Sequence, residues 1–222
     1  MLVRLLLGRG QLAHFSGGGV SAAEDRVGVH AVSSEDRARA EVYALLGALL
    51  ARPPTEKMLQ LLRRIEPPDP GQDMAPAWGA LKQVAIRAET AAVADEYQEL
   101  FIGIGRGELV PYGSWYLTGF LMEKPLAELR ADLKRLGFER REGVSEPEDH
   151  AAALCETMSL LAGGGGHDLA VQREFFEKHI DPWMGRFFGD LATARAASFY
   201  RAVGLLGERF LEVEKSYLSM LA

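Results

Sequence analysis

Residues 33–54 read SSEDRARAEVYALLGALLARPP and predict one amphipathic helix together with both of its ends. Ser33 and Asp36 have the spacing of a capping box, in which side chains satisfy free backbone N–H groups. Apolar residues then recur at the three- and four-residue spacing of one helix face, namely Val42, Leu45, Leu46, Leu49 and Leu50. Pro53 and Pro54 end the helix, because proline lacks the amide hydrogen and clashes with the preceding turn.

The same helical period continues along the chain. It predicts helices over residues 58–65, about 76–92, about 93–101, 126–136 and 151–161, shorter pieces around 175–176 and 183–191, and a long last helix over 199–217. Proline and glycine runs separate these helices, and residues 103–113 form an ordered connection. No segment alternates as a strand does, and no internal repeat is present. The prediction is an all-α, single-domain helical bundle over residues 34–222.

Residues 1–33 show no helical period and contain a run of three glycines at 17–19. This composition predicts a disordered N-terminal extension. The apolar run at Leu5, Leu6 and Leu7 is too short for the hydrophobic region of a secretory signal, and glycine and arginine interrupt it.

The overall charge excludes one class of partner. Asp and Glu number 31 against 25 Lys and Arg, which gives a formal net charge of −6. Nucleic-acid binding depends on neutralising phosphates with cations, so the balance argues against a nucleic-acid partner. No stretch has the roughly 18 apolar residues that a membrane helix needs, so stable membrane insertion is not expected. Cys155 is the only cysteine, which excludes an internal disulfide and favours a reducing, cytoplasmic compartment.

Motifs for catalysis and metal binding are missing from the sequence. Gly103, Gly105 and Gly107 suggest a dinucleotide loop, but Glu108 replaces the third glycine of G-x-G-x-x-G and the run follows a helix. None of the five histidines forms H-E-x-x-H, and no G-x-S-x-G elbow is present. The chain is therefore predicted not to be an enzyme and to have no metal site.

An aromatic-rich segment is the first candidate site. Six aromatic residues fall between Tyr97 and Phe120. Aromatic rings supply a large apolar area at low entropic cost, and Tyr and Trp add a polar group, which suits a peptide-binding groove. An aromatic-rich part of the core would give the same pattern.

The second candidate is the segment Ser145-Glu146-Pro147-Glu148-Asp149-His150. Ser145 and Glu148 fit a second capping box, with proline in the first turn of the helix. On such a helix Glu146 and His150 share one face. The clustered carboxylates could equally pair with arginines of a ligand. The pattern leaves both interpretations open.

Together these segments resemble the TorD-like redox enzyme maturation chaperones, the family that includes DmsD and the more distant NarJ branch. The resemblance rests on Glu96-Tyr97-x-x-Leu100-Phe101-x-Gly103, Pro111-Tyr112-x-Ser114-x-Tyr116 and Glu146-Pro147-x-Asp149-His150. Trp183-Met184-x-Arg186-Phe187 and Phe199-Tyr200-Arg201 resemble the last helices of the family. The likeness spans about residues 34–219.

The resemblance implies a cytosolic chaperone that binds the twin-arginine signal peptide, or the apoprotein, of a molybdenum enzyme until its cofactor is inserted. It carries peptide binding over to Tyr112, Ser114, Tyr116, Glu146, Pro147, Asp149 and His150, with Leu100, Phe101 and Trp115 as further members. An aromatic groove buries the apolar part of the signal, and Glu146 and Asp149 meet its arginines. No tightly bound cofactor is implied; weak guanine-nucleotide binding and transient contact with molybdopterin stay open, as does the choice between monomer and homodimer.

Three alternatives remain from the sequence. A nucleotide-dependent enzyme or switch would need a site without a phosphate loop. A helical scaffold would dock a protein surface without specificity for a leader. A NarJ-like chaperone would assemble a nitrate reductase that stays on the cytoplasmic side. The identity of the client enzyme is not encoded in these motifs.

Overall fold

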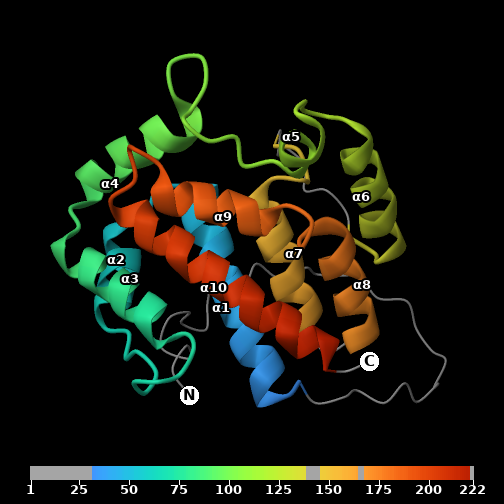
Figure 1. Cartoon of the computed structure of the whole chain (residues 1–222), viewed down its shortest axis with the longest axis horizontal. Helices are drawn as coiled ribbons and strands as arrows, with labels where there is room; N and C mark the ends of the chain where they lie inside the picture. The colour runs from blue at the N-terminus through green and yellow to red at the C-terminus, as the bar shows by residue number, and fades with distance from the viewer. Residues whose placement is uncertain (1–31, 139–145, 165–167, 221–222) are drawn as a thin grey trace, which may run out of the picture.

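The computed structural model describes residues 32–138, 146–164 and 168–220, and these residues form an all-helical bundle (Figure 1). The all-α prediction is confirmed, and in the described residues the only β-type pairing is an isolated bridge between Tyr112 and His150. Residues 1–31 of the predicted N-terminal extension lie outside the described residues. The helices are α1 (Ser34–Ala51), α2 (Glu56–Arg63), α3 (Ala75–Arg87), α4 (Thr90–Tyr97), the π-helical turn η2 (Gln98–Ile102), α5 (Gly113–Thr118), α6 (Lys124–Arg135), α7 (Ala151–Gly163), α8 (Leu169–His179), α9 (Met184–Thr193) and α10 (Phe199–Ser219).

Helix α1 runs through the centre of the bundle. It packs along α7, and the long last helix α10 lies beside α9 and crosses α1 (Figure 1). Ser33 caps α1 as predicted, because its Oγ accepts the N–H of Asp36 at 2.9 Å. The predicted apolar face of α1 is buried, with Leu46 and Leu49 fully inaccessible to solvent. The first helix of the sequence therefore supplies the core on which the others pack.

Two predicted helix boundaries need correction. The helix predicted over about 76–92 ends at Arg87, and the next helix, predicted from about residue 93, begins earlier, as α4 at Thr90. The break is stabilised from another helix, since the guanidinium of Arg63 donates hydrogen bonds to the carbonyls of Ala85 and Ala88 at 2.9 and 3.0 Å. Such capping in three dimensions leaves no periodic signal in the local sequence. Helix α5 begins at Gly113, where the predicted connection ends, and the sequence did not predict it, because six residues are too few to show a helical period.

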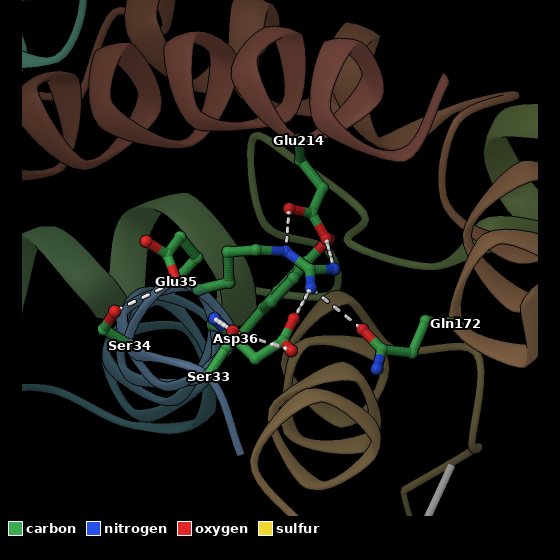
Figure 2. A network of polar contacts seen from close by, with 8 residues as sticks. Ser33, Ser34, Glu35, Asp36, Gln172 and Glu214 are labelled. Atoms are coloured by element: carbon green, nitrogen blue, oxygen red, sulfur yellow. Dashed lines mark hydrogen bonds and ion pairs between the residues drawn. The ribbon is translucent and has the colours of Figure 1, made fainter. Parts of the chain in front are cut away.

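A buried polar network ties α10 to α1 (Figure 2). The guanidinium of Arg39 donates to both carboxylate oxygens of Glu214 at 2.6 and 2.7 Å, and to Gln172 on α8 at 2.9 Å. Asp36 pairs with the same guanidinium, and the Tyr43 hydroxyl donates to Glu214. Glu214 is completely buried. Buried charges need partners of this kind, so the network fixes how α1, α8 and α10 meet.

The start of α10 is capped by a side chain from another helix. Both carboxylate oxygens of Glu96, on α4, accept backbone N–H groups: those of Ser198 at 2.8 Å, Phe199 at 3.0 Å and Tyr200 at 2.7 Å. Ser198, the residue at the cap position, makes no side-chain cap of its own. Glu96 thus satisfies the free donors that open every helix and holds α4 against α10.

None of the helices that the structure describes is both long enough and apolar enough to cross a membrane.

Candidate functional site

The two candidate segments, far apart in sequence, are paired through their backbones. The N–H of Gly113 donates to the carbonyl of Asp149 at 2.9 Å, and the N–H of Ala151 donates to the carbonyl of Pro111 at 2.8 Å. These bonds flank the bridge between Tyr112 and His150. The start of α5 and the start of α7 therefore form one unit, which we call the paired motif, made of residues 111–116 and 146–150.

Asp149 holds the start of α5. Its Oδ2 accepts the N–H of Ser114 at 2.8 Å, and both residues are buried. The Oγ of Ser114 and the Oδ1 of Asp149 are also buried, and neither has a hydrogen-bond partner among the described residues. Buried polar atoms without partners are costly and uncommon. They mark a polar spot inside the paired motif.

His150 caps α7, which corrects the expected start of this helix. Its Nδ1 accepts the N–H of Ala152 at 3.1 Å, and α7 begins at Ala151 rather than within the acidic segment. Residues 146–150 are a non-helical turn, so Glu146 and His150 do not share a helix face; Ser145, the other predicted cap, lies outside the described residues. Burial lowers the pKa of His150 to about 4, opposed by the nearby charge of Asp149. The imidazole is therefore neutral near pH 7 and acts as an acceptor.

Glu146 supplies an exposed carboxylate at the paired motif. The hydroxyl of Tyr112 donates to this carboxylate, and the Tyr112 ring meets the His150 ring edge-on, with centres 5.0 Å apart. Pro147 is half-buried beside it. Glu148 pairs with Arg130 on α6 at 2.9 Å. Of the acidic residues in this turn, Asp149 faces inward and Glu146 faces solvent.

Tyr116 belongs to a neighbouring aromatic layer. Its ring centre lies 5.5 Å from that of Trp183 and 6.0 Å from that of Phe187, and its hydroxyl donates to Asp190 at 2.8 Å. Burial and the Asp190 carboxylate raise the pKa of Tyr116. The guanidinium of Arg186 donates to the Tyr116 carbonyl at 2.9 Å. Tyr116 therefore joins the paired motif to α9.

Trp115 is half-buried on α5, and the guanidinium of Arg106 lies over its ring at 4.7 Å from the centre. Leu100 and Phe101 take a different place. Leu100 is fully buried in the core, and Phe101 packs against Tyr97 and Tyr200 at ring-centre distances of 4.9 and 5.4 Å. The contacts of these two residues are those of core side chains.

Pockets occur elsewhere on the surface. One of about 590 Å³ lies between the start of α3 and α10, and none of its lining residues belongs to the paired motif: Gly71, Gln72, Asp73, Pro76, Ala77, Leu205, Glu208, Arg209 and Glu212. The surface around α5 is instead apolar, with exposed side chains at Leu117, Phe120, Leu121 and Met122. Within the described ranges, no three His, Cys, Asp or Glu side chains converge as metal ligands.

Sequence reasoning missed the partners of Tyr116 and Trp115. Trp183, Phe187 and Asp190 come from α9, and Arg106 comes from the glycine-rich connection. The resemblance of residues 183–187 to a late family helix was the signal available, but nothing in the sequence showed that this helix packs on α5.

Comparisons with known proteins match this chain over more than half of its length. The sequence model of a family described as the nitrate reductase delta subunit matches residues 68–189, more than half of the chain. The chaperone protein TorD of Vibrio atlanticus is 24% identical over 203 residues, which cover 82% of this chain and 94% of TorD. TorD of Vibrio parahaemolyticus is 22% identical over 84% of this chain and 97% of its own length.

Two further proteins are similar. A protein from Haemophilus influenzae described as a probable Tat proofreading chaperone, DmsD, is 29% identical over 54% of this chain and 59% of its own length. The crystal structure of an Archaeoglobus fulgidus protein assigned to redox enzyme maturation superposes with a TM-score of 0.53 at 18% identity, and covers 84% of this chain and 99% of that one. This last likeness concerns the fold.

Proposed function

The chain belongs to the TorD/DmsD/NarJ family of redox enzyme maturation chaperones, whose sequence model is described as the nitrate reductase delta subunit, and we propose that it binds the twin-arginine leader of a molybdenum-cofactor oxidoreductase. In this role it holds the apoprotein in the cytoplasm until the cofactor is inserted. The similar proteins are named as chaperones and not as enzymes, in agreement with the prediction from the sequence.

The paired motif is the observation that supports this function most. The two segments carried over from the resemblance meet through backbone bonds, and Asp149 orients α5 through Ser114. This unit carries the exposed carboxylate of Glu146, and exposed apolar residues follow it along the chain from α5 onward. A leader combines arginines with an apolar stretch, and these surfaces offer one contact for each part.

The roles proposed for the site residues differ. Glu146 forms a charge-assisted hydrogen bond with an arginine of the leader, because its carboxylate is exposed. Asp149, Ser114 and His150 position the backbone of the paired motif, since all three are buried. Tyr112 and Tyr116 line the surface along which the apolar part lies. Leu100 and Phe101 have an indirect role, because they pack in the core, Phe101 against Tyr97 and Tyr200.

Titration calorimetry with a synthetic peptide tests the proposal. The peptide carries an Arg-Arg pair followed by an apolar stretch, and a matched peptide carries Gln-Gln instead. We expect binding of the Arg-Arg peptide and weaker binding of the Gln-Gln peptide. Tyr116→Ala should weaken binding more than Glu146→Gln, because desolvated aromatic contacts contribute most affinity while exposed acids mainly set orientation and association rate. Tyr116→Phe, which removes only the hydrogen bond to Asp190, serves as control. Equal affinity of the wild type and Tyr116→Ala would refute the role of this surface.

A NarJ-like function is the second candidate, and the description of the family as the nitrate reductase delta subunit favours it. A client on the cytoplasmic side needs no export leader. A pull-down of a candidate apoenzyme with and without its leader distinguishes the two functions, since only the leader-binding chaperone loses its client when the leader is removed. The same preparations, heated with millimolar guanine nucleotide, test nucleotide binding, which would raise the melting temperature.

A further inference from the structure

The connection between η2 and α5 places an arginine on one of the motif rings. Arg106 is exposed, and its guanidinium carbon lies 4.7 Å from the centre of the half-buried Trp115 ring. Among the described residues, no carboxylate is within ion-pair distance of this guanidinium. A guanidinium on an aromatic face at an exposed site changes an equilibrium by only about two- to five-fold. The contact is formed, yet it is weak enough to be exchanged.

The backbone of this connection fixes where Arg106 stands. Gly103 has φ +63, and a Cβ atom there would lie 2.0 Å from the carbonyl oxygen of Arg106, so the turn requires glycine. At its base the N–H of Gly103 donates to the carbonyl of Gln98 at 2.7 Å, and the N–H of Leu109 donates to that of Leu100 at 2.8 Å. In Figure 1 the connection between α4 and α5 projects from the helical body. Backbone hydrogen bonds at both ends thus hold the turn in place, with Arg106 against Trp115 of α5.

Exposed apolar side chains occur in both of the chain segments that meet at this contact. Ile104, at the tip of the turn, is fully exposed. The other exposed apolar residues are Ile102 before the turn and Leu117, Phe120, Leu121 and Met122 after Trp115. Exposed apolar residues concentrated in two segments that touch are typical of an interaction surface. A peptide bound along these two segments would contact apolar side chains that precede Trp115 in the sequence and others that follow it.

We propose that Arg106 occupies, on Trp115, the place of an arginine of the client leader, and that leader binding displaces it. The inference rests on the proposed function and adds the residue that recognises one arginine of the pair. Exchanging one guanidinium for another leaves the ring with the same type of contact. The apolar stretch of the leader then covers Phe120, Met122 and their neighbours, which Arg106 cannot do.

The chemistry favours an arginine over an apolar side chain as the occupant. The Trp115 face already accepts a guanidinium, and the planar guanidinium stacks on aromatic rings better than an ammonium does. The net charge of −6 draws a cationic peptide toward the protein. The release of Arg106 to water breaks no ion pair with any carboxylate of the residues that the structure describes.

A double-mutant cycle tests the exchange. The wild type and Arg106→Ala are titrated with the Arg-Arg peptide and with its Gln-Gln counterpart. We expect Arg106→Ala to bind the Arg-Arg peptide about two- to five-fold more tightly, since the internal competitor is gone, and to bind the Gln-Gln peptide unchanged. In Trp115→Leu the ring contacts of both guanidinium groups are lost together, so its affinity for the Arg-Arg peptide should stay near that of the wild type, and adding Arg106→Ala to it should no longer tighten binding. Arg201→Ala, which removes the same charge from an exposed position on α10, serves as control and should bind like the wild type.

The outcomes separate the two proposals. If neither peptide binds the wild type, the proposed function fails and the exchange fails with it. If the Arg-Arg peptide binds the wild type but Arg106→Ala binds it equally or more weakly, only the exchange is refuted. Tryptophan fluorescence gives a second measurement, because Trp78 and Trp183 are buried and Trp115 is not. The Arg-Arg peptide should change the emission of the wild type and leave that of Trp115→Leu unchanged.

Discussion

Removing the negative charge of Glu96 should destabilise the whole protein, although the side chain is only half-buried and lies at the end of a short helix. Its carboxylate accepts three backbone N–H groups at the start of α10, from Ser198, Phe199 and Tyr200. In Glu96→Gln an amino group replaces one oxygen and cannot accept the N–H of Phe199, so two N–H donors face each other. The other oxygen can keep its two bonds but loses its charge.

The expected size follows from these bonds. A hydrogen bond to a charged group contributes about 1.5–3 kcal/mol, and a lost N-terminal cap costs about 1 kcal/mol and up to about 2. The three bonds share one carboxylate and are partly open to water, so their contributions do not add. We expect Glu96→Gln to lower the free energy of unfolding by about 1–2 kcal/mol, and Glu96→Ala by about 2–4 kcal/mol.

Urea unfolding followed by circular dichroism measures this difference. Glu99→Gln is the matched control, because it removes the same charge three residues further on from an exposed side chain. The slope of the transition should be the same in all variants, because the substitutions do not change the surface area that unfolding exposes. If Glu96→Gln loses no more stability than Glu99→Gln, the capping of α10 by Glu96 is not a stabilising contact and the reasoning is refuted.

Three other substitutions test separate contacts. His150→Asn keeps an acceptor at the cap but cannot titrate. In the wild type, His150 binds a proton below about pH 6.5 in the unfolded chain but only below about pH 4 in the folded chain, so the folded protein loses stability as the pH falls. In urea unfolding, the variant should therefore lose about 2 kcal/mol less stability than the wild type between pH 7 and pH 5. Glu214→Leu leaves the Arg39 guanidinium buried without its main partner and should lower the free energy of unfolding by about 3–5 kcal/mol. The double variant with Arg39→Met should recover most of this loss. A double variant as unstable as the single one would contradict the stabilising role of the ion pair. Gly204→Ala puts a methyl group 2.5 Å from the backbone of α9 and should cost about 1–3 kcal/mol in thermal unfolding, whereas Gly189→Ala, with its nearest neighbour at 3.6 Å, should be neutral or slightly stabilising; equal effects would show that the two helices are not tightly packed.

Local patterns were sufficient wherever a helix is specified by its own residues. The cap at Ser33 and the buried face of α1 both follow from short-range rules, and the structure confirms them. The end of α3 did not follow, because Arg63 from α2 satisfies its last carbonyls. The start of α7 did not follow either, because the backbone pairing with Pro111 holds residues 146–150 out of the helix.

The residue types of the candidate site were recognisable in the sequence, but their roles were not. Asp149 and Glu146 look alike in an acidic turn, yet one is buried against Ser114 and the other faces solvent. Tyr116 and Phe101 look alike in an aromatic segment, yet one meets α9 and the other packs on Tyr200. Their participation in peptide binding stays a prediction, which the titrations above test.

The sequence alone determined that this protein is helical, where most helices lie and which family it belongs to, because helix periods, caps and motif spacings are properties of neighbouring residues. Only the tertiary structure decided that residues 111–116 pair with 146–150, that Glu96 caps a helix about a hundred residues away, and that Arg106 lies on Trp115. Such contacts depend on how whole helices pack, and the burial and charge that select them exist only once the chain is folded.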